Sequence, residues 1–174
     1  SDLQMLSGEE IEYLLRTPNE HQQFESSASA KQQSNDIARF KQSVAAYPQH
    51  SACRYYDGDG QQQIISYQQL DSLSDALAES LTDLEVTNND AVGICLSRSP
   101  QTLVAILAVL KLGASYVPLD IALPKARLSF MIDDAQIETV LTTSGHLSLL
   151  PLDTVEVLWL DDILTTDLSQ VSFD

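Results

Sequence analysis

Apolar residues begin to recur at helical spacing near residue 36, where we expect the globular part of the chain to start. Four of them lie three or four positions apart and predict one face of a helix that ends before Pro48: Ile37, Phe40, Val44 and Tyr47. Upstream, residues 19–35 are rich in Gln and Ser, and residues 7–10 have the Ser-x-x-Glu form of a helix N-terminus. The pattern therefore predicts a linker with a short helix over residues 1–35 and a globular domain over residues 36–174.

A β-hairpin and a long helix are predicted next. Two β-rich runs, residues 52–56 and 63–67, flank an Asp-Gly-rich turn, which predicts a hairpin. Ser66 and Gln69 have the spacing of a capping box and predict the start of a helix. The apolar face of this helix is expected to contain Leu70, Leu73, Ala76, Leu77, Leu81 and Leu84.

From residue 91 onward, apolar runs alternate with helical segments. Residues 91–96 form an unbroken apolar run that suits a central parallel strand covered on both faces. Ser99 and Pro100 are typical of a helix start, and Gly113 of a helix end. The pattern then repeats with strands expected over residues 115–118, 139–142 and 155–160 and a helix from Pro124. This alternation predicts an α/β fold with a doubly wound, mostly parallel sheet flanked by helices.

Composition narrows the classes of protein that this chain can belong to. Its 174 residues suit one domain, and its formal net charge of -16 disfavours nucleic-acid and anionic-membrane partners. The longest apolar run, residues 103–110, is too short to span a membrane, and the N-terminal residues lack a signal-peptide pattern. Cys53 and Cys95 lie in apolar runs and are interpreted as buried thiols rather than a disulfide. We therefore expect a cytoplasmic protein.

We find no sequence motif that is typical of a phosphate-binding, catalytic or metal-binding site. Residues 142–145, Thr-Thr-Ser-Gly, resemble the opening of a phosphate loop, but no second glycine or lysine follows, which favours an ordinary strand-to-helix turn. His146 alone among the histidines follows a predicted strand, and neither it nor His21 or His50 has an identifiable Ser or Cys partner. The acidic pairs at 133–134 and 161–162 are assigned to helix ends. No catalytic, cofactor-binding or metal-ligating residue is predicted.

Two motifs nevertheless resemble a known family. Residues 110–120, Leu-Lys-Leu-Gly-Ala-Ser-Tyr-Val-Pro-Leu-Asp, closely resemble the second core motif of the adenylation domains of nonribosomal peptide synthetases, and residues 65–70 resemble the first. Residues 92–100 and 124–128 also fall where that family has similar sequence, and residues 6–10 resemble its condensation-to-adenylation linker. Three positions depart from the usual motif residues: Gln69 replaces Glu, Leu112 replaces Ala and Ile121 replaces Pro. The resemblance covers almost the whole chain and implies the N-terminal subdomain of an adenylation domain.

The resemblance also implies what this chain lacks. In the family, the ATP-binding Thr-Ser-Gly-Ser-Thr-Gly-x-Pro-Lys-Gly loop, the ribose-binding aspartate and the C-terminal lysine all lie downstream of the matched motifs. ATP and Mg²⁺ are thus implied for the complete family domain, and no cofactor is expected in this chain. We therefore expect a partial adenylation domain that is catalytically incompetent alone and acts as a structural or docking segment between condensation and carrier domains.

Two alternatives stay open. The chain is alternatively the N-terminal fragment of an active ATP-dependent amino-acid-adenylating ligase, whose catalytic motifs lie in a missing C-terminal part. A third interpretation is an unrelated α/β protein that binds a small molecule.

Overall fold

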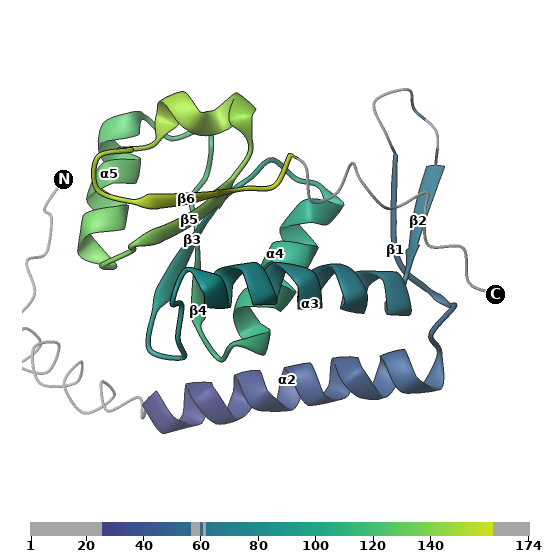
Figure 1. The fold of residues 1–174 in the computed structure, drawn as a ribbon. Coiled ribbons are helices and arrows are strands. Elements are labelled where there is room, and N and C mark those ends of the chain that lie inside the picture. Colours follow the sequence, from purple (N-terminus) through teal and green to yellow (C-terminus); the bar gives the residue numbers. More distant parts are fainter. Residues whose placement is uncertain (1–25, 57–59, 61, 162–174) are drawn as a thin grey trace, which may run out of the picture. The chain divides into compact units, whose positions relative to one another are not determined.

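The computed structural model describes residues 26–56, 60 and 62–161 (Figure 1). The chain separates into two units, Ser1–Gln32 and Gln33–Asp174. Apart from residues 26–32, the fold and the sites below belong to the second. The capping motif predicted at residues 7–10, the turn at 57–59, His21 and Asp162 lie outside the described residues.

Helix α2, Ser26–Ala46, ends just before Pro48, as the sequence pattern predicts. It begins at Ser26, however, so the predicted start at residue 36 is wrong. The Gln- and Ser-rich stretch from residue 26 contains no Gly or Pro and includes the strong helix formers Ala, Lys and Gln. Its polar composition therefore does not prevent a helix.

The predicted hairpin is confirmed. Strands β1, Ser51–Tyr56, and β2, Gln62–Ser66, pair antiparallel, and helix α3, Tyr67–Asp83, follows directly. The capping box is also confirmed, since the Gln69 backbone N–H donates to Ser66 Oγ at 3.2 Å and the Ser66 N–H donates to Gln69 Oε1 at 2.9 Å. The buried face of α3 comprises Leu70, Ser74, Leu77, Ala78 and Leu81. Ala76 is exposed, contrary to prediction, because it lies off the stripe that Ser74 and Ala78 continue.

The main sheet has four parallel strands in the order β4-β3-β5-β6, which confirms the predicted α/β class. These strands are β3 (Ala91–Cys95), β4 (Ser115–Pro118), β5 (Thr139–Thr142) and β6 (Glu156–Trp159). They are connected by helices α4 (Pro100–Lys111) and α5 (Lys125–Asp134) and the 3-10 helix η2 (Ser144–Leu149). The chain leaves β3 toward β4 and then crosses to β5 on the other side of β3, so the strand order reverses between β3 and β5.

Both faces of the sheet are covered, as a doubly wound fold requires (Figure 1). Val92 and Ile94 of β3 belong to the apolar core shared with α3 and α4. Cys95 and Val140 belong to a second core with Leu128 of α5. Side chains of β3 thus alternate between two cores, which is the period-2 pattern of a central strand. Within the described ranges, no helix is long and apolar enough to cross a bilayer.

Candidate functional site

Ligands of open α/β sheets bind outside the carboxyl ends of the strands, at the point where strand order reverses. Here that point lies between β3 and β5. The fully buried Thr142 side chain fills it, and its Oγ1 donates a hydrogen bond to the Cys95 carbonyl at 2.8 Å. Burial also raises the pKa of the Cys95 thiol, which keeps the sulfur protonated and unreactive. At the reversal point the ends of β3 and β5 are therefore bonded to each other, and neither side chain is exposed.

The loop after β5 is the segment whose sequence resembles a phosphate loop. Its Ser144 backbone N–H donates to Asp161 Oδ2 at 2.6 Å, and Ser144 Oγ donates to Asp161 Oδ1 at 3.2 Å. The Asp161 carboxylate thus caps the amino end of η2. The interpretation of residues 142–145 as a strand-to-helix turn is confirmed, with a 3-10 helix as the helix concerned.

The two described histidines both have structural contacts. His146 Nδ1 lies 2.8 Å from Thr143 Oγ1, within the turn that precedes η2. His50 stacks on Tyr47, with ring centroids 5.1 Å apart, and its carbonyl accepts a hydrogen bond from the Tyr67 N–H. These contacts hold turns in place.

A small hollow of about 270 Å³ lies beside the carboxyl end of β4. Arg98, Thr102, Tyr116 and Asp120 supply its polar lining, next to apolar side chains of β3 and α4. Two of these groups are engaged locally: Thr102 Oγ1 donates to the Ser97 carbonyl at 2.9 Å, and Asp120 Oδ1 accepts from the Ala122 N–H at 2.9 Å. The hollow has one charge of each sign and gives an anion little net attraction.

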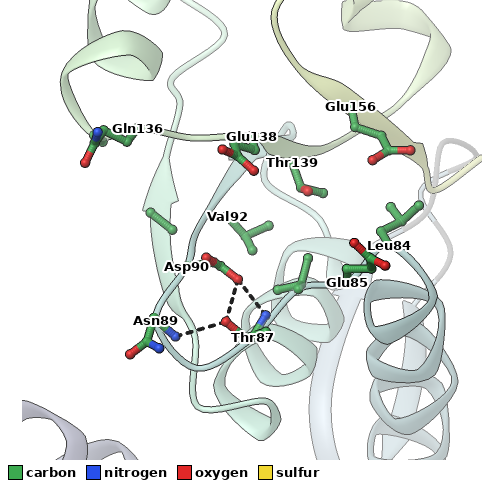
Figure 2. A pocket seen from close by; sticks show the side chains of 13 residues that line it. Leu84, Glu85, Thr87, Asn89, Asp90, Val92, Gln136, Glu138, Thr139 and Glu156 are labelled. Atoms are coloured by element: carbon green, nitrogen blue, oxygen red, sulfur yellow. Dashed lines mark hydrogen bonds between the residues drawn. The ribbon is translucent and has the colours of Figure 1, made fainter.

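A larger hollow of about 620 Å³ lies at the opposite edge, where β3, β5 and β6 begin (Figure 2). Its described lining carries four carboxylates and neither Lys nor Arg: Glu85, Asp90, Glu138 and Glu156. The Asp90 carboxylate accepts hydrogen bonds from the Thr87 N–H at 2.6 Å and Thr87 Oγ1 at 2.8 Å, and these bonds lower the pKa of Asp90. Such a lining repels phosphate groups. Across the described residues, no three potential metal ligands come together.

One residue of the second motif has a role that the sequence pattern does not indicate. Lys111 ends α4, and its side chain is only 7% exposed. Its Nζ lies 2.7 Å from Asp71 Oδ1 and 2.6 Å from Asp75 Oδ1 of α3. The signal in the sequence is a lone lysine at the end of an otherwise apolar helix. The rest of the motif is structural as expected, since Gly113 ends α4 with φ 76° and Tyr116 lies in β4.

Known protein sequences are similar to this chain over most of its length. The model of the AMP-binding enzyme family matches residues 40–171. One linear gramicidin synthase chain of Brevibacillus parabrevis is 35% identical over 160 residues, which are 92% of this chain and 2% of that synthase. Another linear gramicidin synthase chain of the same organism is 43% identical over 102 residues, which are 59% of this chain and 2% of that synthase. The chain thus spans about one fiftieth of the length of these relatives.

Solved structures agree on the fold. Klebsiella oxytoca NpsA in complex with 3-hydroxyanthranilyl-AMSN has a TM-score of 0.63 and 24% identity, over 80% of this chain and 27% of that chain. NpsA-ThdA, an artificially fused adenylation-PCP di-domain from the same organism, has a TM-score of 0.64 and 24% identity, over 80% of this chain and 26% of that chain. The resemblance to the N-terminal part of a nonribosomal peptide synthetase adenylation domain is confirmed.

Proposed function

We propose a function on the premise that this chain belongs to the AMP-binding enzyme family, as a partial adenylation domain of a nonribosomal peptide synthetase. In our proposal, residues 36–174 are a structural lobe that is catalytically incompetent alone. The lobe serves as a docking segment within a synthetase, and residues 1–35 link it to the preceding domain.

The hydrogen bonds at the reversal point are the observation that carries this proposal. Thr142 bonds to the Cys95 carbonyl there, and Asp161 caps the neighbouring turn with a negative charge. ATP with Mg²⁺ needs free N–H donors, a cation for the phosphates and oxygen ligands for the metal. The described lining of the hollow at this edge offers one cation, Arg98, together with the carboxylate of Asp120, and the first N–H of η2 is already bound to Asp161. These groups give ATP little support, whereas a structural role needs none of them.

Neighbouring domains are the proposed partners. NpsA-ThdA joins an adenylation domain to a PCP in one artificial fusion, which supports a carrier-domain neighbour for this chain as well. Residues 6–10 resemble a condensation-to-adenylation linker, which supports a condensation domain on the other side. Free Cys53 and Cys95 fit the reducing cytoplasm, where such synthetases would work.

Amino-acid-dependent ATP–pyrophosphate exchange tests the catalytic half of the proposal. We expect the 174-residue chain to stay at background with all twenty amino acids, while a complete adenylation domain from a linear gramicidin synthase, assayed alongside, exchanges. Exchange by the isolated chain above background would overturn the proposed incompetence.

Deletion of residues 36–174 from the parent synthetase tests the docking half. We expect loss of product or loss of association between the neighbouring domains. Unchanged product formation would contradict a docking role whatever the exchange assay shows.

A second candidate function is the N-terminal portion of an active amino-acid-adenylating ligase. The 35% identity to a linear gramicidin synthase over 92% of this chain favours it. If the parent protein catalyses amino-acid-dependent ATP–pyrophosphate exchange and loses this activity when residues 36–174 are deleted, the result selects this candidate over the inactive lobe.

A further inference from the structure

The apolar face of helix α2 is only partly buried on the lobe. In its described half, residues 36–46, no side chain is fully buried. Phe40 is half-buried against the core of α3 and α4, and its ring centroid lies 6.2 Å from that of Tyr67. Ile37 and Val44 are also only half-buried. Because burial of apolar surface is the main force that holds helices together, this partial burial leaves room for a polar interaction to add to the attachment of α2.

That interaction is an ion cluster made of Lys41 from α2, Asp71 and Asp75 from α3, and Lys111 from α4. Lys41 Nζ lies 2.7 Å from Asp71 Oδ1 and 3.2 Å from Asp75 Oδ2. Lys111 Nζ approaches the same two carboxylates, at 2.7 Å and 2.6 Å. Two lysines and two aspartates make the ion cluster electrically neutral, and Asp71 Oδ1 accepts from both lysines.

Lys111 holds the two carboxylates in place. Its ammonium lies 2.6–2.9 Å from four acceptors of α3, Asp71 O, Asp71 Oδ1, Ser74 Oγ and Asp75 Oδ1, and 5.8 Å from the centroid of the Phe40 ring of α2. Asp71 and Asp75 lie four residues apart on one helix, where like charges repel each other. Without Lys111, that repulsion would favour other rotamers, and the acceptors would no longer converge on Lys41.

The far end of α2 is fixed independently of the ion cluster. The Gln68 N–H donates to the Pro48 carbonyl at 3.0 Å, and the Tyr67 N–H donates to the His50 carbonyl at 3.1 Å. Gln49 Nε2 also donates to Gln68 Oε1 at 2.8 Å. These bonds tie the turn at residues 47–50 to the start of α3 and would survive release of the helix that precedes it.

We propose that the ion cluster is a latch. Lys111 positions Asp71 and Asp75 so that they capture Lys41, and this capture holds residues 36–46 of α2 on the lobe. When the capture fails, that segment leaves the lobe while the turn at residues 47–50 stays bound and serves as the pivot. The latch goes beyond the proposed function and does not depend on it, because it follows from contacts within the lobe.

Hydrogen–deuterium exchange of the full 174-residue chain tests the latch. In K41M, we expect the amides of residues 40–46 to exchange about three- to fivefold faster than in the unmutated chain, because the Lys41 side chain is 45% exposed. In K111M, which removes a buried charge, we expect at least the same acceleration. The exchange rates of amides in β3 and β5 should stay within twofold of their values in the unmutated chain. K125M, which removes an exposed lysine from the first turn of α5, is the matched control and should leave every segment within twofold.

Two outcomes would overturn the latch. The first is unchanged exchange of residues 40–46 in K41M, above all if F40A accelerates it, because apolar packing would then hold α2. The second is equal acceleration of α2, α4 and β3 in K111M, which would make Lys111 a core residue. If K111M fails to fold, K41M and D75N carry the test, since these side chains are 45% and 54% exposed and their loss spares the core.

Discussion

Gly93 lies in the middle of β3, where neighbouring side chains leave no room for a Cβ atom. A Cβ added there would lie 2.9 Å from Leu119 Cδ1 and 3.1 Å from Val140 Cγ2. The end of the Leu119 side chain can shift, but both neighbours are buried in the same core. Gly93→Ala is therefore expected to lower the free energy of unfolding by about 1–3 kcal/mol through overpacking. Urea unfolding at constant slope measures the loss.

Gly145 provides the matched control for this substitution. A Cβ added at Gly145 meets no atom within 4 Å. Gly145→Ala should change the free energy of unfolding by no more than about 0.5 kcal/mol. Equal losses in the two variants would contradict overpacking as the cause.

For single residues, the sequence predicts contacts between residues that are close along the chain and misses contacts between residues that are far apart along it. Ser66 and Gln69 are three residues apart, and their mutual hydrogen bonds follow from spacing. Asp161 caps Ser144 from 17 residues away, and Lys111 bonds to Asp71 from 40 residues away. Such partners meet only because strand order and helix packing bring them together, which single-sequence periodicity does not encode.

Among the elements, α3 depends on its capping box. Ser66 Oγ accepts the N–H of Gln69, one of the amides that has no partner within the helix. Ser66→Ala is expected to lower the free energy of unfolding by about 1 kcal/mol. Thermal unfolding followed by circular dichroism measures this loss of stability. Ser72→Ala, at an exposed position inside the same helix, is the control and should be neutral or slightly stabilising.

Element identity is predicted well wherever apolar residues repeat with a clear period. Strands β1 to β6 lie where their apolar runs place them, and α3, α4 and α5 follow their N-terminal signals. The start of α2 is missed because residues 26–35 carry no apolar stripe, so helix propensity alone decides their state. The candidate site is less predictable than the fold, since the bond between Thr142 and Cys95 at the reversal point depends on which strands become neighbours.

For the whole molecule, the excess of acid in the sequence has two different structural meanings. Some carboxylates, such as Glu138 and Glu156, line the hollow at the amino edge of the sheet. Others stabilise the fold directly: Asp90 accepts two hydrogen bonds from Thr87, and Asp75 pairs with Lys111 and Lys41. Burial opposes ionisation of Asp75, but the bonds from Lys111 and Lys41 outweigh it and lower its pKa. The formal charge of -16 does not distinguish these two groups.

The carboxylates of lowered pKa predict how stability changes with pH. A carboxyl group whose folded pKa lies below the unfolded value of about 3.9 contributes stability that is complete above that value and is lost as pH falls through the folded pKa. We therefore expect the free energy of unfolding to fall as the pH is lowered from about 5 to about 2.5.

Asp90→Asn should flatten this decline in the free energy of unfolding, because the hydrogen bonds from Thr87 that lower the pKa of Asp90 favour its charged form. Urea unfolding midpoints across this range measure the slope, and Asp134→Asn, an exposed acid with the same change in net charge, should leave it as steep as in the unmutated chain. Equal flattening by both variants would assign the acid sensitivity to overall charge rather than to the Thr87–Asp90 turn.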